Sequence, residues 1–249
     1  MKNISNNQAI SKLIFALDAK SYEDALELVE LLSGSVGMFK VGKELFTAAG
    51  PRIVERIKEK DQRVFLDLKF HDIPNTVARA AEAAMRMGVD MFNIHAAGGS
   101  KMIRETMQAV ENYSVKTNIC RPIVLAVTVL TSLNDEDLKE IGYTKTTKEL
   151  VNQLAGLAKA AGASGAVASA QDIAAVRSVA GNDFVIVTPG IRGLNNAAKD
   201  DQKRTMSAFS AIKAGADYIV VGRPIREASD PLAACRQIAD EIKDGLAAR

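Results

Sequence analysis

The sequence contains no tryptophan, and aromatic residues of all kinds make up only 5% of its 249 positions. Its two cysteines, Cys120 and Cys235, cannot build a disulfide framework, and no CxxC or Cys/His spacing indicates a structural zinc site. Apolar runs such as 123–127 are far shorter than a membrane span, and the polar start MKNISNNQAISK lacks the apolar core of a signal peptide. We therefore expect a protein of the reducing cytoplasm with no membrane partner.

A large excess of charge of either sign is also missing. The chain carries 32 Lys and Arg residues against 30 Asp and Glu residues, a formal net charge of +2. Proteins that bind nucleic acid through its phosphates usually have a larger basic excess, so we expect no nucleic-acid partner. Hydrophobic residues at 47% and charged residues at 25% are typical of a globular enzyme and exclude disordered and collagen-like chains.

Short apolar runs rich in β-branched residues alternate along the chain with longer segments of helical period. The runs predict strands at 13–18, 38–41, 64–69, 91–95, 123–130, 165–168, 184–188 and 218–221. Segments between them, such as 22–29 and 150–161, have apolar residues three and four positions apart, which predicts helices. This alternation favours a parallel sheet, because parallel neighbours need a crossover long enough to hold a helix.

Eight strand-helix units in a chain of this length predict an α/β fold of the (β/α)8 TIM barrel type. We expect one domain over residues 1–249, with a short polar N-terminal extension at about 1–10, because no Gly/Ser-rich linker or Pro-rich hinge divides the chain. An open, doubly wound sheet is the alternative architecture. The irregular segments around 131–146 and 194–203 follow the fifth and seventh strands, so we expect them to be loops of the active face.

The stretch DLKFHDIPNT, which spans residues 67–76, concentrates charge at the end of the third predicted strand. On a regular strand, Asp67 and Lys69 point to one side, and Leu68 and Phe70 point to the other. Asp67 and Lys69 are therefore expected to face the barrel interior together. An ion pair that only fills the barrel is the structural alternative, although such a buried pair is weak support for stability.

The first two strands deliver charge to the same rim as the third. Asp18 ends the first strand, and Lys40 is embedded in the apolar residues of the second. Asp72 lies just past the third strand and precedes Ile73 and Pro74, and proline is suited to the first turn of the next helix. Four of these side chains form a set that alternates in sign: Lys40, Asp67, Lys69 and Asp72. Each member then has an oppositely charged neighbour, which keeps it ionised at neutral pH.

Barrels often bind phosphate through the loops that follow strands seven and eight. Here the seventh strand is followed by residues 189–192, Pro-Gly-Ile-Arg, and the eighth by residues 222–224, Gly-Arg-Pro. Glycine allows the backbone to approach an anion closely, and the guanidinium groups of Arg192 and Arg223 supply a planar fork for phosphate oxygens. The two loops predict a phosphate site, and two ordinary turns with arginines facing solvent are the alternative.

His71 and His95 lie on or near different strands, and the sequence contains no third histidine. Two such residues make a poor metal site, so we expect no metal. His71 is expected to serve instead as a structural hydrogen-bonding group.

DLKFHDIPNT resembles the bacterial form of the DxKxxD motif of the orotidine 5'-phosphate decarboxylase family. Other motifs follow that family's order over the whole chain: ALD at 16–18, FKVG at 39–42, TVLTS at 128–132, TPGIR at 188–192, DQKR at 201–204 and VGRPI at 221–225. One departure is Asp200, which stands where many relatives have glycine before the Asp-Gln pair.

The resemblance implies that orotidine 5'-phosphate is converted to uridine 5'-phosphate (UMP) and carbon dioxide, the last step of UMP biosynthesis, without a metal or an organic cofactor. It implies that Lys69 donates the proton to the ring carbon that loses carbon dioxide. Asp67 then holds this ammonium group and places negative charge near the substrate carboxylate. Asp72 is implied to complete the charge array from the other subunit of a homodimer, with Ile73 and Thr76 contacting the same substrate.

The remaining substrate contacts are likewise implied by the resemblance. Asp18 and Lys40 would hold the ribose hydroxyls, and Thr131 the pyrimidine edge. The phosphate end would be held by residues of the two late loops: Pro189, Arg192, Gln202, Gly222 and Arg223, with Gln202 also reaching the pyrimidine. Taken alone, Asp18 also fits a helix cap, and Thr131 fits a turn former.

Two other functions fit part of this pattern. A sister family of sugar-phosphate decarboxylases shares the DxKxxD motif but uses magnesium, and Arg192 and Gln202 in their loop contexts speak against it. A non-catalytic nucleotide-binding barrel would keep the phosphate loops but is expected to lack Lys69 or one of its carboxylates.

Overall fold

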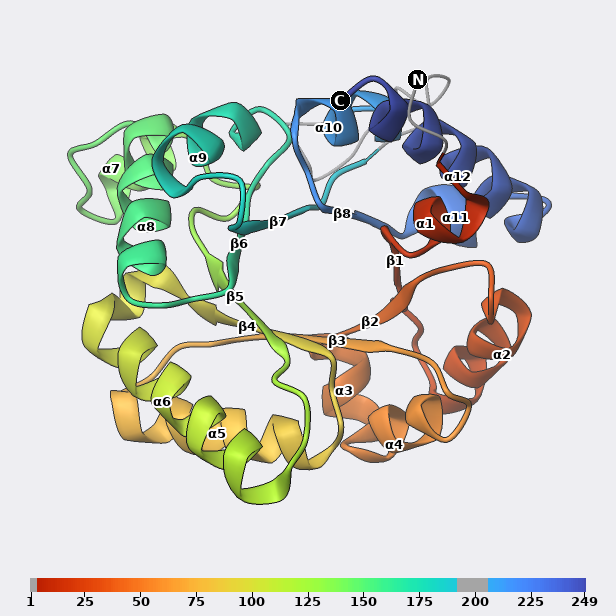
Figure 1. The fold of residues 1–249 in the computed structure, drawn as a ribbon, viewed down its shortest axis with the longest axis horizontal. Coiled ribbons are helices and arrows are strands. Elements are labelled where there is room, and N and C mark those ends of the chain that lie inside the picture. The colour runs from red at the N-terminus through yellow and green to blue at the C-terminus, as the bar shows by residue number, and fades with distance from the viewer. Residues whose placement is uncertain (1–3, 192–205) are drawn as a thin grey trace.

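The computed structural model describes residues 4–191 and 206–249, and its centre is a closed ring of parallel strands (Figure 1). The strands are β1 (Leu13–Ala16), β2 (Met38–Gly42), β3 (Val64–Phe70), β4 (Met91–His95), β5 (Ile123–Val127), β6 (Gly165–Val167), β7 (Val185–Thr188) and β8 (Tyr218–Val221). They pair in chain order, and Ile14 of β1 lies opposite Val220 of β8. The predicted (β/α)8 barrel is confirmed, because this pairing closes the sheet that a doubly wound fold would leave open.

Helices surround the ring on its outside. They are α1 (Asn6–Ile10), α2 (Tyr22–Leu32), α3 (Lys43–Ala49), α4 (Arg52–Lys58), α5 (Pro74–Arg86), α6 (Gly99–Thr117), α7 (Asp135–Glu140), α8 (Thr147–Ala160), α9 (Ile173–Ala180), α10 (Ala208–Ala214), α11 (Arg223–Arg226) and α12 (Pro231–Ala247), with a short 3-10 turn η1 (Ala96–Gly98). Among the described residues, none of these helices is long and apolar enough to cross a membrane.

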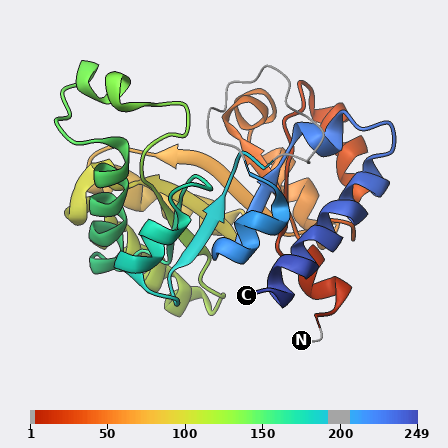
Figure 2. The ribbon, with the colours of Figure 1, turned by 90° about the horizontal axis from the view of Figure 1, so that it is seen from above.

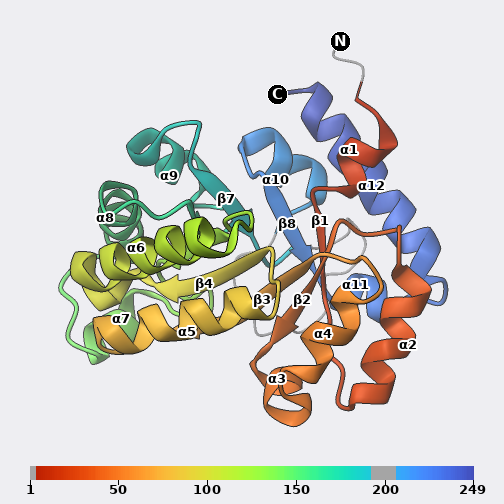
Figure 3. The same ribbon diagram turned by 60° about the horizontal axis from the view of Figure 1, so that its bottom comes forward.

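Local sequence signals explain several helix starts. Pro74 occupies the first turn of α5, as the sequence predicts, and α5 lies beside α6 along β3 and β4 (Figure 3). Proline suits this position because the first helical N–H groups have no partner within the helix. Thr146 and Glu149 form a reciprocal capping box at the start of α8. Near the N-terminus, α1 packs on α12, and Nζ of Lys243 donates to Oδ1 of Asn6 at 3.2 Å.

Three strands end earlier than the sequence predicts: β1, β5 and, by one residue, β6. β5 stops at Val127, three residues before the predicted end, because its neighbour β6 supplies no partner beyond Val167. β1 stops at Ala16, and the N–H of Asp18 donates to the carbonyl of Ala16 at 2.9 Å, which turns the chain out of the sheet. Asp18 therefore lies on the loop after β1, not on the strand itself.

The segment 131–146 also differs from its prediction as an irregular loop, because it contains α7. Asn134 and Asp137 form a capping box at the start of this helix. That signal is readable in the sequence, where Asn134 precedes three acidic residues, which favour a helix start. Figure 2 shows α7 projecting beyond the ring of helices.

Apolar side chains form two separate clusters. The inner cluster fills the barrel and consists of Ile14, Ala16, Met38, Phe65, Met91, Leu125, Val187 and Val220. A larger outer cluster packs the strands against the helices and includes Phe15 and Phe39, whose rings meet edge to face at 6.2 Å between centroids. This alternation follows from the two-residue period of a strand. The inner cluster therefore makes the middle of the barrel apolar.

Gly165 is required where β6 lies against β7. A Cβ atom built on Gly165 would overlap the carbonyl oxygen of Val185, which is part of the sheet backbone. We predict that Gly165→Ala lowers the free energy of unfolding by about 1–3 kcal/mol, the usual cost of overpacking. Urea denaturation measures this change.

Gly156 in α8 is the matched control, because a Cβ atom there meets nothing within 4 Å. Gly156→Ala is expected to leave stability unchanged or raise it by up to about 1 kcal/mol, since alanine is the better helix former. Equal stability of Gly165→Ala and the wild type would contradict the steric explanation.

Candidate active site

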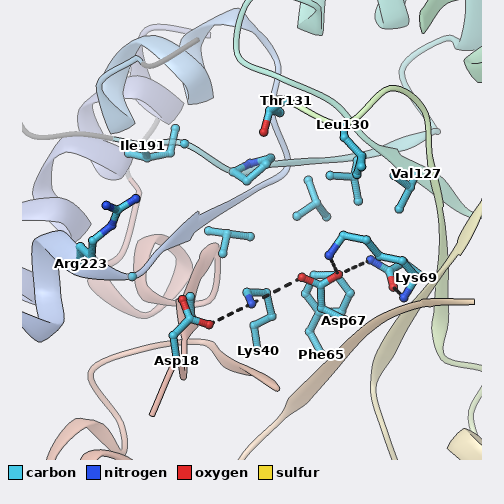
Figure 4. Close-up of a pocket in the computed structure, with 18 of the residues that line it drawn as sticks. Asp18, Lys40, Phe65, Asp67, Lys69, Val127, Leu130, Thr131, Ile191 and Arg223 are labelled. Atoms are coloured by element: carbon cyan, nitrogen blue, oxygen red, sulfur yellow. Dashed lines mark hydrogen bonds and ion pairs between the residues drawn. The ribbon is translucent and has the colours of Figure 1, made fainter. Parts of the chain in front are cut away.

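A pocket with charged and apolar walls opens at the C-terminal end of the barrel, where catalytic groups of TIM barrels lie (Figure 4). Every strand, or the loop that follows it, contributes side chains to the pocket wall. The charged residues of the wall are Asp18, Lys40, Asp67, Lys69 and Arg223. This pocket is therefore the candidate active site.

Four of these charged side chains form a continuous chain of alternating sign. Nζ of Lys69 lies 2.7 Å from Oδ1 of Asp67, and Nζ of Lys40 lies 3.4 Å from Oδ2 of Asp67. Lys40 also lies 3.4 Å from Oδ1 of Asp18, which extends the chain toward solvent. Asp67 and Lys40 are only 14% and 12% exposed, so water screens their interaction weakly.

Asp67 is held in its ionised form by its neighbours. Burial by itself would raise the pKa of the Asp67 carboxyl, but the cations of Lys40 and Lys69 and the amide of Asn93 outweigh it and lower the pKa below its ordinary value. A carboxylate between two ammonium groups therefore persists in the pocket at neutral pH.

The strand that carries Asp67 and Lys69 is irregular. Leu66 pairs with Phe92 and Phe70 pairs with Ile94, so β3 advances by four residues while β4 advances by two. Lys69 has a φ of 54°, in the left-handed region that non-glycine residues seldom adopt. The sequence prediction of a regular strand is wrong here, because a bulge interrupts the ladder.

The predicted facing of the side chains is nevertheless confirmed. Asp67 and Lys69 line the pocket, whereas Leu68 and Phe70 pack against the outer apolar cluster. The bulge changes the backbone at Lys69 without turning its side chain away from Asp67.

The structure adds Asn93 of β4, which the sequence-based prediction of the site does not include. Asn93 is 1% exposed and lies opposite the bulge. Its Nδ2 donates to Oδ1 of Asp67 at 2.7 Å, and its Oδ1 accepts the backbone N–H of Lys69 at 2.7 Å. A signal was present in the sequence, because Asn93 shares a strand face with Met91 of the inner cluster and is a single amide in an apolar run.

Other predicted residues lie outside this pocket. Asp72, Ile73 and Thr76 follow β3 at the surface, and none of them lines the pocket in the single chain. Oδ1 of Asp72 accepts the N–H of Ile73 at 2.6 Å, and Ile73 is 67% exposed. The sequence predicts Asp72 as the fourth member of the charge array. Within one chain, Asp18 takes that place instead. Assignment of Asp72 to a partner's site stays a prediction.

The late loops meet the pocket at its other end. Thr131, Pro189, Gly222 and Arg223 all line it, and Figure 4 shows Arg223 at the end away from Lys69. A Cβ atom at Gly222 would lie 3.2 Å from Cβ of Ala16, so glycine allows this loop to pack closely on β1. The predicted contacts Arg192 and Gln202 lie outside the described residues.

His71 and His95 stack their rings, with centroids 5.1 Å apart and an angle of 28° between planes. The structure thus gives His71 a ring contact, and no hydrogen bond of His71 occurs within the described residues. The described part of the chain also contains no group of three or more His, Cys, Asp or Glu side chains placed to hold a metal ion.

A closed parallel barrel with a pocket of paired lysines and aspartates at its C-terminal end has the architecture of a TIM-barrel enzyme. Residues 11–238 match the model of the Orotidine 5'-phosphate decarboxylase / HUMPS family, and the chain belongs to this family.

Curated relatives and solved structures agree with this membership. The chain is 56% identical to an orotidine 5'-phosphate decarboxylase of Syntrophus aciditrophicus over 100% of its own length and 99% of the relative's. It is 52% identical to the orotidine 5'-phosphate decarboxylase of Saccharophagus degradans, over 93% of this chain and 94% of the relative's. The crystal structure of orotidine 5'-phosphate decarboxylase from Lactobacillus acidophilus superposes with a TM-score of 0.82 at 36% identity, covering 92% of this chain and 98% of that one.

His95 predicts a pH dependence of stability. Burial lowers its pKa from 6.5 to about 4, with help from the nearby His71 ring and the cations of Lys43 and Lys69. The unfolded chain then binds a proton on His95 near pH 6.5, whereas the folded protein binds it only near pH 4. The free energy of unfolding therefore falls as the pH is lowered from 6.5 to 4. We predict that His95→Gln makes this decline less steep, as measured by urea denaturation at several pH values.

Thr106→Val is a suitable control, because it removes a buried hydrogen bond of α6 without removing a titratable group. Its effect on stability is expected to be the same at each pH. Parallel pH curves for His95→Gln and the wild type would contradict the role given to His95.

Proposed function

We propose that the pocket at the C-terminal end of the barrel converts orotidine 5'-phosphate to UMP and carbon dioxide, the last step of UMP biosynthesis, with Lys69 as the proton donor. Family membership and relatives matched over their full length support this substrate and reaction. The observation that carries the mechanism is the Lys69 ammonium group, 2.7 Å from a carboxylate that Lys40 also holds.

The chemistry requires a cation at the reacting carbon. When the bond to the carboxylate breaks, its electron pair stays on the pyrimidine ring carbon, and carbon dioxide leaves. Lys69 stabilises the developing charge and then transfers a proton to that carbon, after which the neutral amine regains a proton from water. Asp67 holds the Lys69 ammonium group in place before the reaction. The negative charge of Asp67 would also repel the substrate carboxylate, and departure of carbon dioxide relieves that repulsion.

The two ends of the pocket suggest how the nucleotide lies. Arg223, beside Gly222 and Pro189, supplies a guanidinium fork for the phosphate at the end away from Lys69. Asp18 and Lys40 lie between these ends and suit the ribose hydroxyls. Thr131 is proposed for the pyrimidine edge. Arg192 and Gln202 are proposed as further phosphate and pyrimidine contacts on the basis of the family motif.

We further propose that the active unit is a homodimer with shared sites. Asp72, Ile73 and Thr76 are exposed beside the pocket strand β3, and the apolar side chain of Ile73 is 67% exposed. An exposed large apolar side chain next to charged groups suits contact with a second copy, which would bring Asp72 to the partner's Lys69.

A cytoplasmic location is proposed as well, because Cys120 and Cys235 are both free thiols, which a reducing compartment maintains.

The release of carbon dioxide from orotidine 5'-phosphate, measured with EDTA present, tests the substrate, the reaction and the cofactor requirement together. We expect turnover that EDTA does not reduce. The competing assignment is a magnesium-dependent sugar-phosphate decarboxylase. Absence of turnover on orotidine 5'-phosphate, with magnesium-dependent turnover of a keto-gulonate phosphate, would overturn the proposal.

The role of Lys69 predicts a separation of binding from catalysis. Lys69→Ala should retain UMP binding, because the phosphate and ribose contacts remain, but lose at least about a thousandfold in kcat. Calorimetry and a turnover assay measure the two quantities. Lys60→Ala is the control, since Lys60 pairs with Glu30 away from the pocket and should keep wild-type turnover. Near wild-type kcat for Lys69→Ala would exclude Lys69 as the proton donor.

Shared sites predict complementation between two inactive variants. In a mixed dimer of Lys69→Ala and Asp72→Ala subunits, one site loses both residues and the other keeps both. Random exchange of equal amounts should therefore restore about a quarter of the wild-type activity. The measurement is turnover after exchange, with exchange itself followed by subunits carrying different tags. Exchange without recovered activity would argue for sites built from a single chain.

A further inference from the structure

Asn93 is a buried polar residue of the pocket wall, and the proposed reaction gives it no role so far. It contacts both catalytic side-chain positions of β3: its Nδ2 donates to Asp67, and its Oδ1 accepts from the backbone of Lys69. At 1% exposure, these hydrogen bonds are shielded from water. Breaking either one would leave a buried polar group without a partner.

The orientation of the Asn93 amide follows from its partners. A backbone N–H can only donate, so the group facing Lys69 must be the amide oxygen. An ionised carboxylate can only accept, so the group facing Asp67 must be the NH2. The two hydrogen bonds therefore fix one another, and a side chain at this position must supply both a donor and an acceptor.

Asn93 also compensates for the bulge in β3. Between the pairs Leu66–Phe92 and Phe70–Ile94, three residues of β3 face Asn93 alone. The regular ladder cannot provide hydrogen-bond partners for the extra backbone groups there. Oδ1 of Asn93 instead accepts a hydrogen bond from the backbone N–H of Lys69, the residue in the left-handed conformation. This contact holds the backbone from which the Lys69 side chain returns toward Asp67.

We propose that Asn93 is a positioning residue that fixes the Asp67–Lys69 pair in its reactive arrangement. Oδ1 of Asp67 accepts from both Nζ of Lys69 and Nδ2 of Asn93, each at 2.7 Å, which leaves Oδ2 for Lys40 at 3.4 Å. Lys40, Lys69 and Asn93 thus hold the carboxylate from three neighbouring strands. This inference rests on the proposed function, because it assigns a role within the same reaction.

Substitution of Asn93 by alanine removes both hydrogen bonds and tests the proposal. We expect Asn93→Ala to lower kcat about ten- to hundredfold, as loss of a hydrogen bond to a charged group implies. UMP affinity should stay within about threefold, since the phosphate end of the pocket is untouched. Turnover of orotidine 5'-phosphate and calorimetric binding of UMP measure these quantities.

Asn93→Asp provides a readout that a purely structural role would not change. Its carboxylate still accepts from Lys69 but replaces the donor to Asp67 by a like charge, which raises the pKa of Asp67. The charged and titratable groups around Asp67 are Lys40 on β2, Lys69 on β3 and His95 on β4. Because the reaction needs an ionised Asp67, activity of Asn93→Asp should be lost at a higher pH than in the wild type as the pH falls. This variant also keeps the test decisive if Asn93→Ala does not fold.

Thr106→Val is the matched control for the loss of a fully buried hydrogen bond away from the pocket. It should keep wild-type kcat at a temperature where all variants are folded. A kcat within about threefold of the wild type for Asn93→Ala, or an acid limb unchanged in Asn93→Asp, would overturn the proposal. Wild-type protein assayed in parallel separates the two hypotheses: an inactive wild type rejects the proposed function, whereas an active wild type with fully active Asn93 variants rejects only the positioning role.

Discussion

The ion pairs around Asp67 are the interaction on which the rest of the pocket depends. Two lysine ammonium groups at the mouth of an apolar barrel are costly to desolvate unless a carboxylate lies beside them. Asp67 serves both Lys40 and Lys69, and Asp18 joins at the solvent side. The array keeps charge of both signs in a place that water reaches poorly, which is the condition under which fixed charges act most strongly on a substrate.

The barrel brings these groups together from distant parts of the chain. β1, β2, β3 and β4 are neighbours in the ring, so the ends of these strands meet although they lie tens of residues apart in the sequence. The inner apolar cluster closes the barrel below them. The bulge in β3 places Lys69 in the left-handed backbone conformation, and Oδ1 of Asn93 accepts the hydrogen bond of its backbone N–H. Fold and site are thus connected through the pairing of β3 with β4.

Much of this arrangement could be predicted from the sequence, because it depends on local patterns. Strand period predicts that Asp67 and Lys69 lie on the pocket side, and both do so although a bulge interrupts the strand. Pro74 starts α5, and strict alternation of strand and helix predicts the barrel. The bulge could not be predicted, because it depends on the register between β3 and β4. The sequence of β3 alone does not determine that register. The early end of β5 has the same origin, since it is set by the short length of β6.

The remaining differences have separate causes. In the sequence, Asn93 is a single polar residue in an apolar strand. Its contact with Asp67 becomes visible only when β4 is paired with β3 in the barrel. The helix α7 carries a capping signal at Asn134 that the prediction of an irregular loop overlooked. Asp72 is exposed and does not line the pocket of the single chain, so its assignment to the charge array stays a prediction. Arg192 and Gln202 lie outside the described residues.

The most direct test of the central claim is a crystal structure of the protein with UMP bound. Because proton transfer requires near contact, Nζ of Lys69 should lie within about 3.5 Å of the pyrimidine carbon that receives the proton, with the phosphate against Arg223. A UMP molecule bound in the opposite direction, or with its ring beyond reach of Lys69, would contradict the assignment of Lys69 as the proton donor.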